Sequence, residues 1–213
     1  MENNQFVPDE NISTQQGIVD KKREKENQRK KNIMGYARDL LLMLSAALLI
    51  LLLLFRVVIV SGPSMRNTLY DGDCIILLNN FLAGDPEPGD IIVASKDSFN
   101  NGEPIIKRVI AVSGQTVDID FSTGQVFVDA VPLSEPYTLT ATNLQEGVKF
   151  PVKVPEGCLF VMGDNRNNSK DSRNPEIGMI DTREVLGKAI FLVLPGANPN
   201  TGKREFDRIG VLS

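Results

Sequence analysis

Ser64 and Lys107 are the two residues of this chain whose types and surroundings favour covalent chemistry. Histidine is absent from all 213 residues, which excludes Ser-His-Asp and Cys-His catalysis and zinc sites that need imidazole. A serine nucleophile needs a base to remove its proton, and lysine is the recognised substitute for histidine. The chemistry that remains must use Ser, Thr, Lys, Tyr, Asp or Glu, and one candidate is attack by a serine hydroxyl with a lysine amine as general base.

Lys107 is the lysine with the most apolar neighbours, in the segment Ile105-Ile106-Lys107-Arg108-Val109-Ile110. In a strand it shares one face with Ile105 and Val109. A free lysine has a pKa of about 10.4, so only about four in ten thousand are neutral at pH 7. Desolvation lowers a lysine pKa by up to ~3–5 units, so this face favours the neutral amine that a base requires. A charge on an edge strand is the alternative interpretation.

Ser64 lies in Val60-Ser61-Gly62-Pro63-Ser64-Met65, where Gly62 and Pro63 favour a tight turn that exposes the hydroxyl. A solvated loop serine is the alternative. A further polar segment, residues 163–173, directly follows the apolar run Leu159–Met162. Its closely spaced opposite charges predict a rigid loop beside a site, although a plain loop of Asx turns has a similar composition.

The elements that must position these residues differ sharply in composition. Residues 1–38 form a polar tail, and residues 21–39 hold eight basic against three acidic side chains. Leu40–Phe55 has only Ser45 as a polar residue and would span about 24 Å as a helix at ~1.5 Å per residue. Val57–Val60 extend the apolar run, so residues 39–60 are predicted to form one transmembrane helix.

The basic flank predicts the orientation of this anchor. It places the N-terminus in the cytoplasm and residues 61–213 outside the cell membrane, in a single-pass arrangement in contact with membrane lipid. A cleaved signal peptide and a buried core helix are the alternatives. A leader of 39 residues is long for a signal peptide, and no small-x-small cleavage site follows the apolar run.

From Ile75 onward, short β-branched runs alternate with turn signals, which is typical of antiparallel β-structure. Asn100-Asn101-Gly102 and Ser122-Thr123-Gly124 each predict a hairpin turn between two such runs. The fold class is therefore mainly β, with an N-terminal transmembrane helix followed by an antiparallel sheet or barrel-like domain at residues 61–213. The predicted strands are Ile91–Lys96, Pro104–Val112, Thr116–Phe121, Gln125–Ala130, Cys158–Met162 and Lys188–Leu194.

From the apolar segment to about Pro195, the chain resembles bacterial type I signal peptidases, which are membrane-anchored endopeptidases with a Ser-Lys dyad. The resemblance implies that Ser64 is the nucleophile and Lys107 the general base. It implies that Ser169 hydrogen-bonds to the lysine and orients it. The matching segments are Gly62-Pro63-Ser64-Met65, Asp71-Gly72-Asp73, Lys107-Arg108-Val109, and Gly163-Asp164-Asn165-Arg166 with Ser169, Asp171, Ser172 and Arg173.

Further roles also follow only from the resemblance. Asp171 and Arg173 are implied to form a supporting ion pair near the site. Gly62 stands where some members have a serine that donates to the oxyanion, and Asn67 stands where members usually have proline. The backbone N–H of Ser64 is then the one donor that can be named, and a second donor is expected because losing one typically costs ~10²–10³ in rate.

The implied reaction is removal of N-terminal signal peptides from secretory preproteins at the outer face of the membrane, through an acyl-enzyme. The substrate would lie extended against a strand, with small residues one and three positions before the cut. No metal or organic cofactor is needed. The net charge of −4 argues against a nucleic-acid partner. The oligomeric state stays open, as does whether Cys74 and Cys158 form a disulfide or remain two thiols.

Two other interpretations remain. A self-cleaving repressor-type Ser-Lys protease shares the dyad, but it would need a DNA-binding module where this chain has an apolar segment. A non-catalytic, membrane-anchored β-domain also fits the composition, but it leaves Ser64, Lys107 and Ser169 without a purpose.

Overall fold

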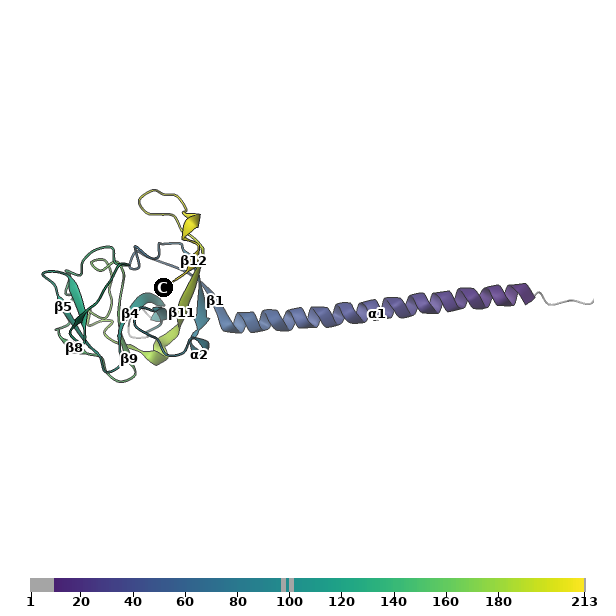
Figure 1. Ribbon diagram of the computed structural model, residues 1–213, viewed down its shortest axis with the longest axis horizontal. Coiled ribbons are helices and arrows are strands. Elements are labelled where there is room, and N and C mark those ends of the chain that lie inside the picture. The colour runs from purple at the N-terminus through teal and green to yellow at the C-terminus, as the bar shows by residue number, and fades with distance from the viewer. Residues whose placement is uncertain (1–9, 97–98, 100–101, 213) are drawn as a thin grey trace, which may run out of the picture. The chain divides into compact units, whose positions relative to one another are not determined.

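The computed structural model describes residues 10–96, 99 and 102–212. The chain divides into two compact units, Met1–Leu51 and Leu52–Ser213. In its described part the first unit is one helix, α1, which runs from Glu10 to Leu54 (Figure 1). The part Lys21–Leu54 is long and apolar enough to cross a membrane, and its most apolar stretch is not buried.

The segment predicted as a transmembrane helix, residues 39–60, is helical only up to Leu54 and continues a longer helix on its N-terminal side. The helix begins at Glu10, within the predicted polar tail, and ends at Leu54. Phe55–Ile59 forms strand β1, which pairs antiparallel with β2 (Cys74–Asn79). Three of these five residues are β-branched, and such side chains favour a pleated strand over a helix when a partner strand is available.

The second unit contains two antiparallel sheets. The large sheet has the order β1-β2-β11-β3-β4-β9-β10, with β12 also pairing with β11, and the small sheet has the order β7-β6-β5-β8. The small-sheet strands β5 and β8 lie at one end of the domain, and β1, β11 and β12 lie at the other (Figure 1). The remaining bounds are α2 Asn80–Ala83, β3 Ile91–Ala94, β4 Ile105–Val112, β5 Thr116–Asp120, β6 Gln125–Val128, β7 Val131–Pro132, β8 Val152–Lys153, β9 Cys158–Met162, β10 Ile180–Asp181, η2 Thr182–Glu184, β11 Val185–Leu194, η3 Phe206–Arg208 and β12 Gly210–Val211.

The mainly antiparallel β fold is as predicted. The strands β3 and β4 pair, as do β5 and β6, and β9 has the predicted bounds. The turn of the second hairpin closes with the N–H of Gly124 donating to Asp120 O at 2.7 Å, and Gly124 has a φ of 76°, which suits glycine. In the first hairpin, Asn100 and Asn101 lie outside the described residues.

The hydrophobic core reaches directly to the segment that carries Ser64. One cluster joins β2, β3 and β11 to Val60, Met65 and Leu69, and the last two side chains are 1% and 0% exposed. Two apolar anchors therefore hold the turn on both sides of the serine.

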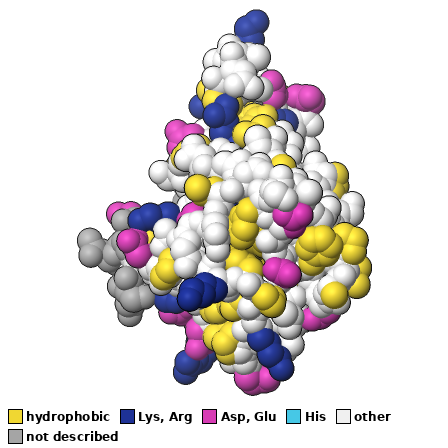
Figure 2. Space-filling view, turned by 90° about the vertical axis from the view of Figure 1, so that its left-hand side faces the viewer, with side chains coloured by type: hydrophobic (Ala, Val, Ile, Leu, Met, Phe, Trp, Pro, Cys, Tyr) yellow, Lys and Arg dark blue, Asp and Glu magenta, His cyan; other side chains and the backbone are white. Residues whose placement is uncertain are grey.

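The surface of the domain is mixed in character. Seen from the end that carries the small sheet, acidic and basic side chains are interspersed with hydrophobic ones (Figure 2). Cys74 and Cys158 are both free thiols and partly buried. Of the two alternatives that the sequence leaves open, a disulfide or two thiols, the structure contains two thiols.

Candidate active site

Ser64 lies in a loop, residues 60–73, whose two ends are joined by hydrogen bonds. The N–H of Val60 donates to Asp73 O at 2.8 Å, and the N–H of Gly72 donates to Val60 O at 2.9 Å. Gly62, with a φ of 90°, donates its N–H to Asp71 Oδ1 at 2.8 Å. This N–H therefore supports the loop, and a left-handed conformation of this kind favours glycine.

The segment after β9 holds the Ser64 turn from the other side. Asn165 donates its N–H to the Ser64 carbonyl at 3.0 Å and its side-chain Nδ2 to the Pro63 carbonyl at 3.1 Å. A Cβ on Gly163 would lie 2.5 Å from Ser64 O and 2.2 Å from Ser169 Oγ. Only a glycine therefore permits this close approach of the two segments.

Lys107 lies on β4 with its amine against the serine hydroxyl. Its Nζ is 2.9 Å from Ser64 Oγ and donates to Ile106 O at 3.1 Å. The residue is 5% exposed. Burial lowers the pKa of Lys107 from 10.5 to about 8, although the charges of Asp171 and Glu146 act to raise it. At a pKa of about 8, roughly one amine in ten would be neutral at pH 7. The low exposure of Lys107 agrees with the burial that its apolar neighbours predict.

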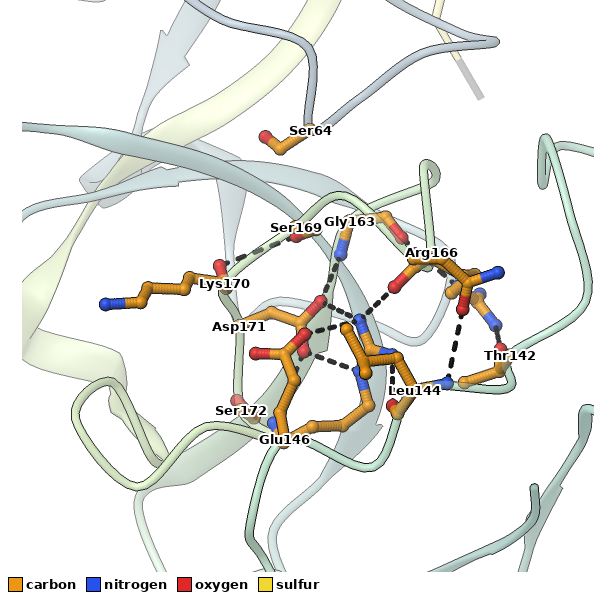
Figure 3. Close-up of polar contacts among 12 residues, drawn as sticks. Ser64, Thr142, Leu144, Glu146, Gly163, Arg166, Ser169, Lys170, Asp171 and Ser172 are labelled. Atoms are coloured by element: carbon orange, nitrogen blue, oxygen red, sulfur yellow. Dashed lines mark hydrogen bonds and ion pairs between the residues drawn. The ribbon is translucent and has the colours of Figure 1, made fainter.

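Ser169 lies beside the site but does not make the expected contact. Its Oγ donates to the carbonyl of Lys170 at 3.4 Å (Figure 3). Among the contacts of the described residues, Lys107 Nζ is hydrogen-bonded to Ser64 Oγ and Ile106 O and not to Ser169. The expected Ser169–Lys107 hydrogen bond is therefore absent from the contacts of the described residues.

Asp171 and Arg173 form a buried ion pair, and both side chains are 0% exposed. Arg173 Nε donates to Asp171 Oδ1 and Nη2 to Oδ2, each at 2.8 Å. The same guanidinium donates to Leu144 O at 2.9 Å and to Arg166 O at 2.6 Å (Figure 3). Asp171 Oδ2 also accepts the N–H of Gly163 at 3.0 Å, so the pair fixes the loop that contacts the Ser64 turn.

A second buried pair joins the base strand to the nucleophile loop. Arg108, next to Lys107, donates Nε and Nη2 to the two oxygens of Asp164 at 3.0 and 2.9 Å. Thr68 Oγ1 donates to Asp164 Oδ2 at 2.5 Å. A carboxylate on one segment thus connects the elements that carry Lys107 and Ser64.

The C-terminal segment also supports the nucleophile loop. Asp73 is 0% exposed, and its carboxylate accepts the N–H of Gly196 at 2.6 Å, the N–H of Tyr70 at 2.8 Å and Arg208 Nη2 at 2.7 Å. The buried charge of Asp73 is therefore neutralised by a residue that follows β11 in the chain.

A cleft of about 510 Å³ opens beside Ser64 and Lys107. One wall is the end of β1 and the residues after it, and the other is the start of β4. Strand β4 pairs with β3 from Ile105 to Arg108, whereas its pairing with β9 begins only at Arg108. The main chain at Ile105–Lys107 therefore has an open edge. The lining residues are Val58, Ile59, Val60, Ser61, Ser64, Met65, Val93, Glu103, Pro104, Ile105, Ile106 and Lys107.

The structure brings together Ser64, Lys107 and the loop of residues 163–173, as the sequence predicts. Sequence reasoning missed Thr68, which carries no signal of its own, and Glu146, a lone acidic residue before a glycine. It did not assign a role to Asn165 or Gly163, although both lie in the charged segment that was singled out.

Comparison with known proteins yields a family and close relatives. Residues 33–194 match the family described as signal peptidase, peptidase S26. A signal peptidase I of Bacillus licheniformis is 36% identical over 180 residues, which cover 81% of this chain and 94% of the relative. Signal peptidase I S of Bacillus subtilis is 31% identical over 78% of this chain and 92% of its own length. A solved signal peptidase I from Enterococcus faecalis V583 is 31% identical, with a TM-score of 0.40, over 49% of this chain and 97% of that structure.

Proposed function

Since the chain belongs to the signal peptidase family, peptidase S26, we propose that it removes signal peptides from secretory preproteins with Ser64 as nucleophile and Lys107 as general base. The observation that carries the assignment is the 2.9 Å distance between Ser64 Oγ and the buried Lys107 Nζ. A serine endopeptidase that uses a lysine base needs these two groups in contact, with the amine free of its proton.

In the acylation step, neutral Lys107 takes the proton of Ser64 Oγ as that oxygen bonds to the carbonyl carbon of the scissile peptide. The protonated amine then gives this proton to the leaving nitrogen, which departs as the N-terminus of the mature protein. In deacylation, Lys107 takes a proton from water, the hydroxide attacks the ester, and the proton returns to Ser64 Oγ.

The oxyanion that forms in both steps requires hydrogen-bond donors. Among the described residues, the backbone N–H of Ser64 has no acceptor, so it is available to the substrate oxygen. The N–H of Gly62 already donates to Asp71, which supports a structural role for Gly62 in shaping the turn.

The cleft supports an extended substrate. A peptide that lies along the open edge of Ile105–Lys107 would form main-chain hydrogen bonds in the manner of an added strand. Val58, Ile106 and Met65 are among the apolar residues that line the cleft beside Ser64. An apolar lining of this kind is compatible with small residues one and three positions before the cut.

Ser64→Ala tests the function directly. The detergent-solubilised protein is incubated with a secretory precursor, and the new N-terminus is identified by mass spectrometry. The parent protein should release one defined mature N-terminus and Ser64→Ala none, while Ser122→Ala, in the exposed β5–β6 turn, should behave like the parent. Cleavage by Ser64→Ala at the parent rate would show that Ser64 is not the nucleophile, and a stable precursor in every sample would favour a non-catalytic β-domain.

The apolar helix and the signal peptidase relatives fit a membrane-anchored enzyme. We further infer that residues 39–54 form the span, that residues 1–38 lie in the cytoplasm and that residues 61–213 lie outside. The basic residues before the span support this orientation. Cysteines introduced at Asn27 and Ser122, in a chain without Cys74 and Cys158, should differ in intact cells. An impermeant maleimide should label position 122 and not position 27, and the reverse pattern would exclude this orientation.

A further inference from the structure

Arg208 is a charged residue near the C-terminus that the proposed mechanism does not use. It lies in η3, two residues before β12, and its side chain is 15% exposed. Strand β12 pairs with β11, and the N–H of Leu212 donates to Ile190 O at 3.0 Å (Figure 1). The main chain that carries Arg208 is therefore attached to the large sheet independently of the Ser64 loop, residues 60–73.

The guanidinium of Arg208 binds the second half of the Ser64 loop. Its Nη1 and Nη2 donate to the two carboxylate oxygens of Asp73 at 3.1 and 2.7 Å, and Nη2 also donates to Thr68 O at 3.1 Å. The guanidinium carbon lies 3.7 Å from the centre of the Tyr70 ring. A planar guanidinium with several donors suits this set of contacts, which a compact ammonium cannot make in the same geometry.

Thr68 connects this guanidinium to the turn that begins at Ser64. The N–H groups of Thr68 and Leu69 donate to Met65 O at 2.9 and 2.8 Å, so the main chain between Ser64 and Thr68 forms a hydrogen-bonded turn. The hydroxyl of Thr68 donates to Asp164 Oδ2 at 2.5 Å. Thr68 is thus bonded through its hydroxyl to the segment after β9 and through its carbonyl to Arg208.

Asp73 connects the same guanidinium to the start of the loop. Its carbonyl accepts the N–H of Val60 at 2.8 Å, while its carboxylate accepts the N–H groups of Tyr70 and Gly196 at 2.8 and 2.6 Å. A Cβ on Gly196 would lie 2.2 Å from Asp71 O, so the residues after β11 lie directly against the main chain of the loop. Contacts from the C-terminal segment therefore reach the loop on both sides of Ser64.

We propose that Arg208 is a positioning residue for the proposed reaction, whose forked contacts with the loop hold the Ser64 hydroxyl against Lys107. The loop contains neither helix nor strand, so contacts with other segments determine where the hydroxyl lies. A shift of about 1 Å in a reacting group costs about 10²-fold in rate. This inference rests on the roles proposed above for Ser64 and Lys107.

The alternative role for Arg208 is to neutralise the buried charge of Asp73 and nothing more. A lysine would supply the same charge, but it could not bond both carboxylate oxygens and the Thr68 carbonyl in the geometry of the guanidinium. The two roles therefore predict different results when the guanidinium is replaced by an amine.

Arg208→Lys tests the proposal, because it keeps the positive charge and removes the fork. We expect kcat for precursor cleavage to fall about 10- to 100-fold. KM should change little, because Asp73, Thr68 and Tyr70 do not line the cleft. The matched control is Arg204→Lys, which replaces an exposed arginine of the same segment and should cleave at the parent rate. The parent kcat in Arg208→Lys would overturn the proposal.

The pH profile separates a change in position from a change in the base. Because the guanidinium acts on the place of the hydroxyl, kcat/KM of Arg208→Lys should be lower than that of the parent at every pH, with the same midpoint. A shifted midpoint with an unchanged plateau would mean that Arg208 acts through the proton affinity of Lys107, and it would contradict the proposal.

A second variant covers the case in which Arg208→Lys does not fold. Asp73→Asn combined with Arg208→Gln removes both charges, so no unpaired charge remains buried. Circular dichroism monitors folding, and the folded double variant should show a fall in kcat of the same order. The parent kcat in the folded double variant would argue against positioning by Arg208. A parent chain that cleaves no precursor would instead refute the proposed function.

Discussion

The backbone N–H of Asn165 lies 3.0 Å from the carbonyl oxygen of Ser64. The nucleophile is thus held by its own main chain, through a residue of the charged segment that follows β9. The side chain of Asn165 holds the preceding carbonyl of Pro63 in the same way. Neither contact uses the hydroxyl of Ser64, which lies against Lys107 Nζ, or its N–H, which remains available to a substrate.

Gly163→Ala should damage this arrangement. A Cβ there would lie 2.5 Å from the Ser64 carbonyl and 2.2 Å from Ser169 Oγ, so the two segments must separate. Misplacement of a nucleophile by about 1 Å costs about 10²-fold in rate, and we expect a loss of kcat of that order. The matched control is Gly210→Ala on β12, where a Cβ meets nothing within 4 Å. Kinetics of precursor cleavage, with circular dichroism to monitor folding, give the comparison, and near-parent kcat in Gly163→Ala would show that the close approach is dispensable.

Lys107→Met should abolish cleavage while preserving the fold. Methionine keeps the length of the side chain but has no base, and general-base catalysis contributes about 10²–10⁴-fold. We expect kcat to fall at least about 10³-fold. Lys153→Met, on the exposed face of β8, should cleave at the parent rate. Processing of a precursor by Lys107→Met at the rate of Lys153→Met would remove Lys107 from the mechanism.

The activity of the parent enzyme should fall at low pH because Lys107 becomes protonated. Its pKa is lowered to about 8 by burial, and the neutral amine is the active form. Therefore kcat/KM should rise about tenfold per unit below pH 8 and level off above it. Initial rates measured between pH 6 and pH 9.5 test this, and a flat profile over that range is incompatible with a lysine base.

The same buried amine should make stability depend on pH. Below pH 8 both the folded and unfolded states hold the proton of Lys107. Between pH 8 and pH 10.5 only the unfolded state holds it, so the free energy of unfolding rises with pH in this window. A shift from 10.5 to about 8 corresponds to about 3 kcal/mol.

Lys107→Met lacks this contribution and provides the reference. At pH 7.5 the free energy of unfolding of the variant should exceed that of the parent. This difference in free energy should decrease by about 3 kcal/mol between pH 7.5 and pH 11. Urea unfolding of both proteins across this range measures the difference. A constant difference would mean that Lys107 has the same proton affinity in the folded and unfolded chains.

Much of the β-structure could be predicted from the alternation of apolar and polar residues. In a half-buried hairpin such as β5–β6, apolar side chains face the core and polar ones face solvent, so the pattern is visible in the sequence. The same reasoning failed for Phe55–Ile59. An apolar run next to a helix has no period that separates the two structures, and the pairing with β2 decides the outcome. Long-range partners of this kind are not visible in local sequence.

In the candidate site, too, local features could be predicted from the sequence, whereas long-range contacts could not. The apolar neighbours of Lys107 predicted its burial, and the structure agrees. Its contact with Ser64, 43 positions earlier in the chain, followed only from the family resemblance, because no local pattern joins two such distant residues. Arg108 follows Lys107 in the strand and is buried as well, because Asp164 neutralises its charge. The expected contact between Ser169 and Lys107 is not among those of the described residues, where the Ser169 hydroxyl donates to the carbonyl of Lys170 instead.

The family match ends at residue 194, but the carboxylate of Asp73 depends on Gly196 and Arg208. Arg208 is the cation that pairs with this buried acid, and burying the acid without it would be strongly unfavourable. The shape of the Ser64 loop therefore depends on residues beyond the family match, and a chain truncated before Arg208 would leave Asp73 without its counter-charge.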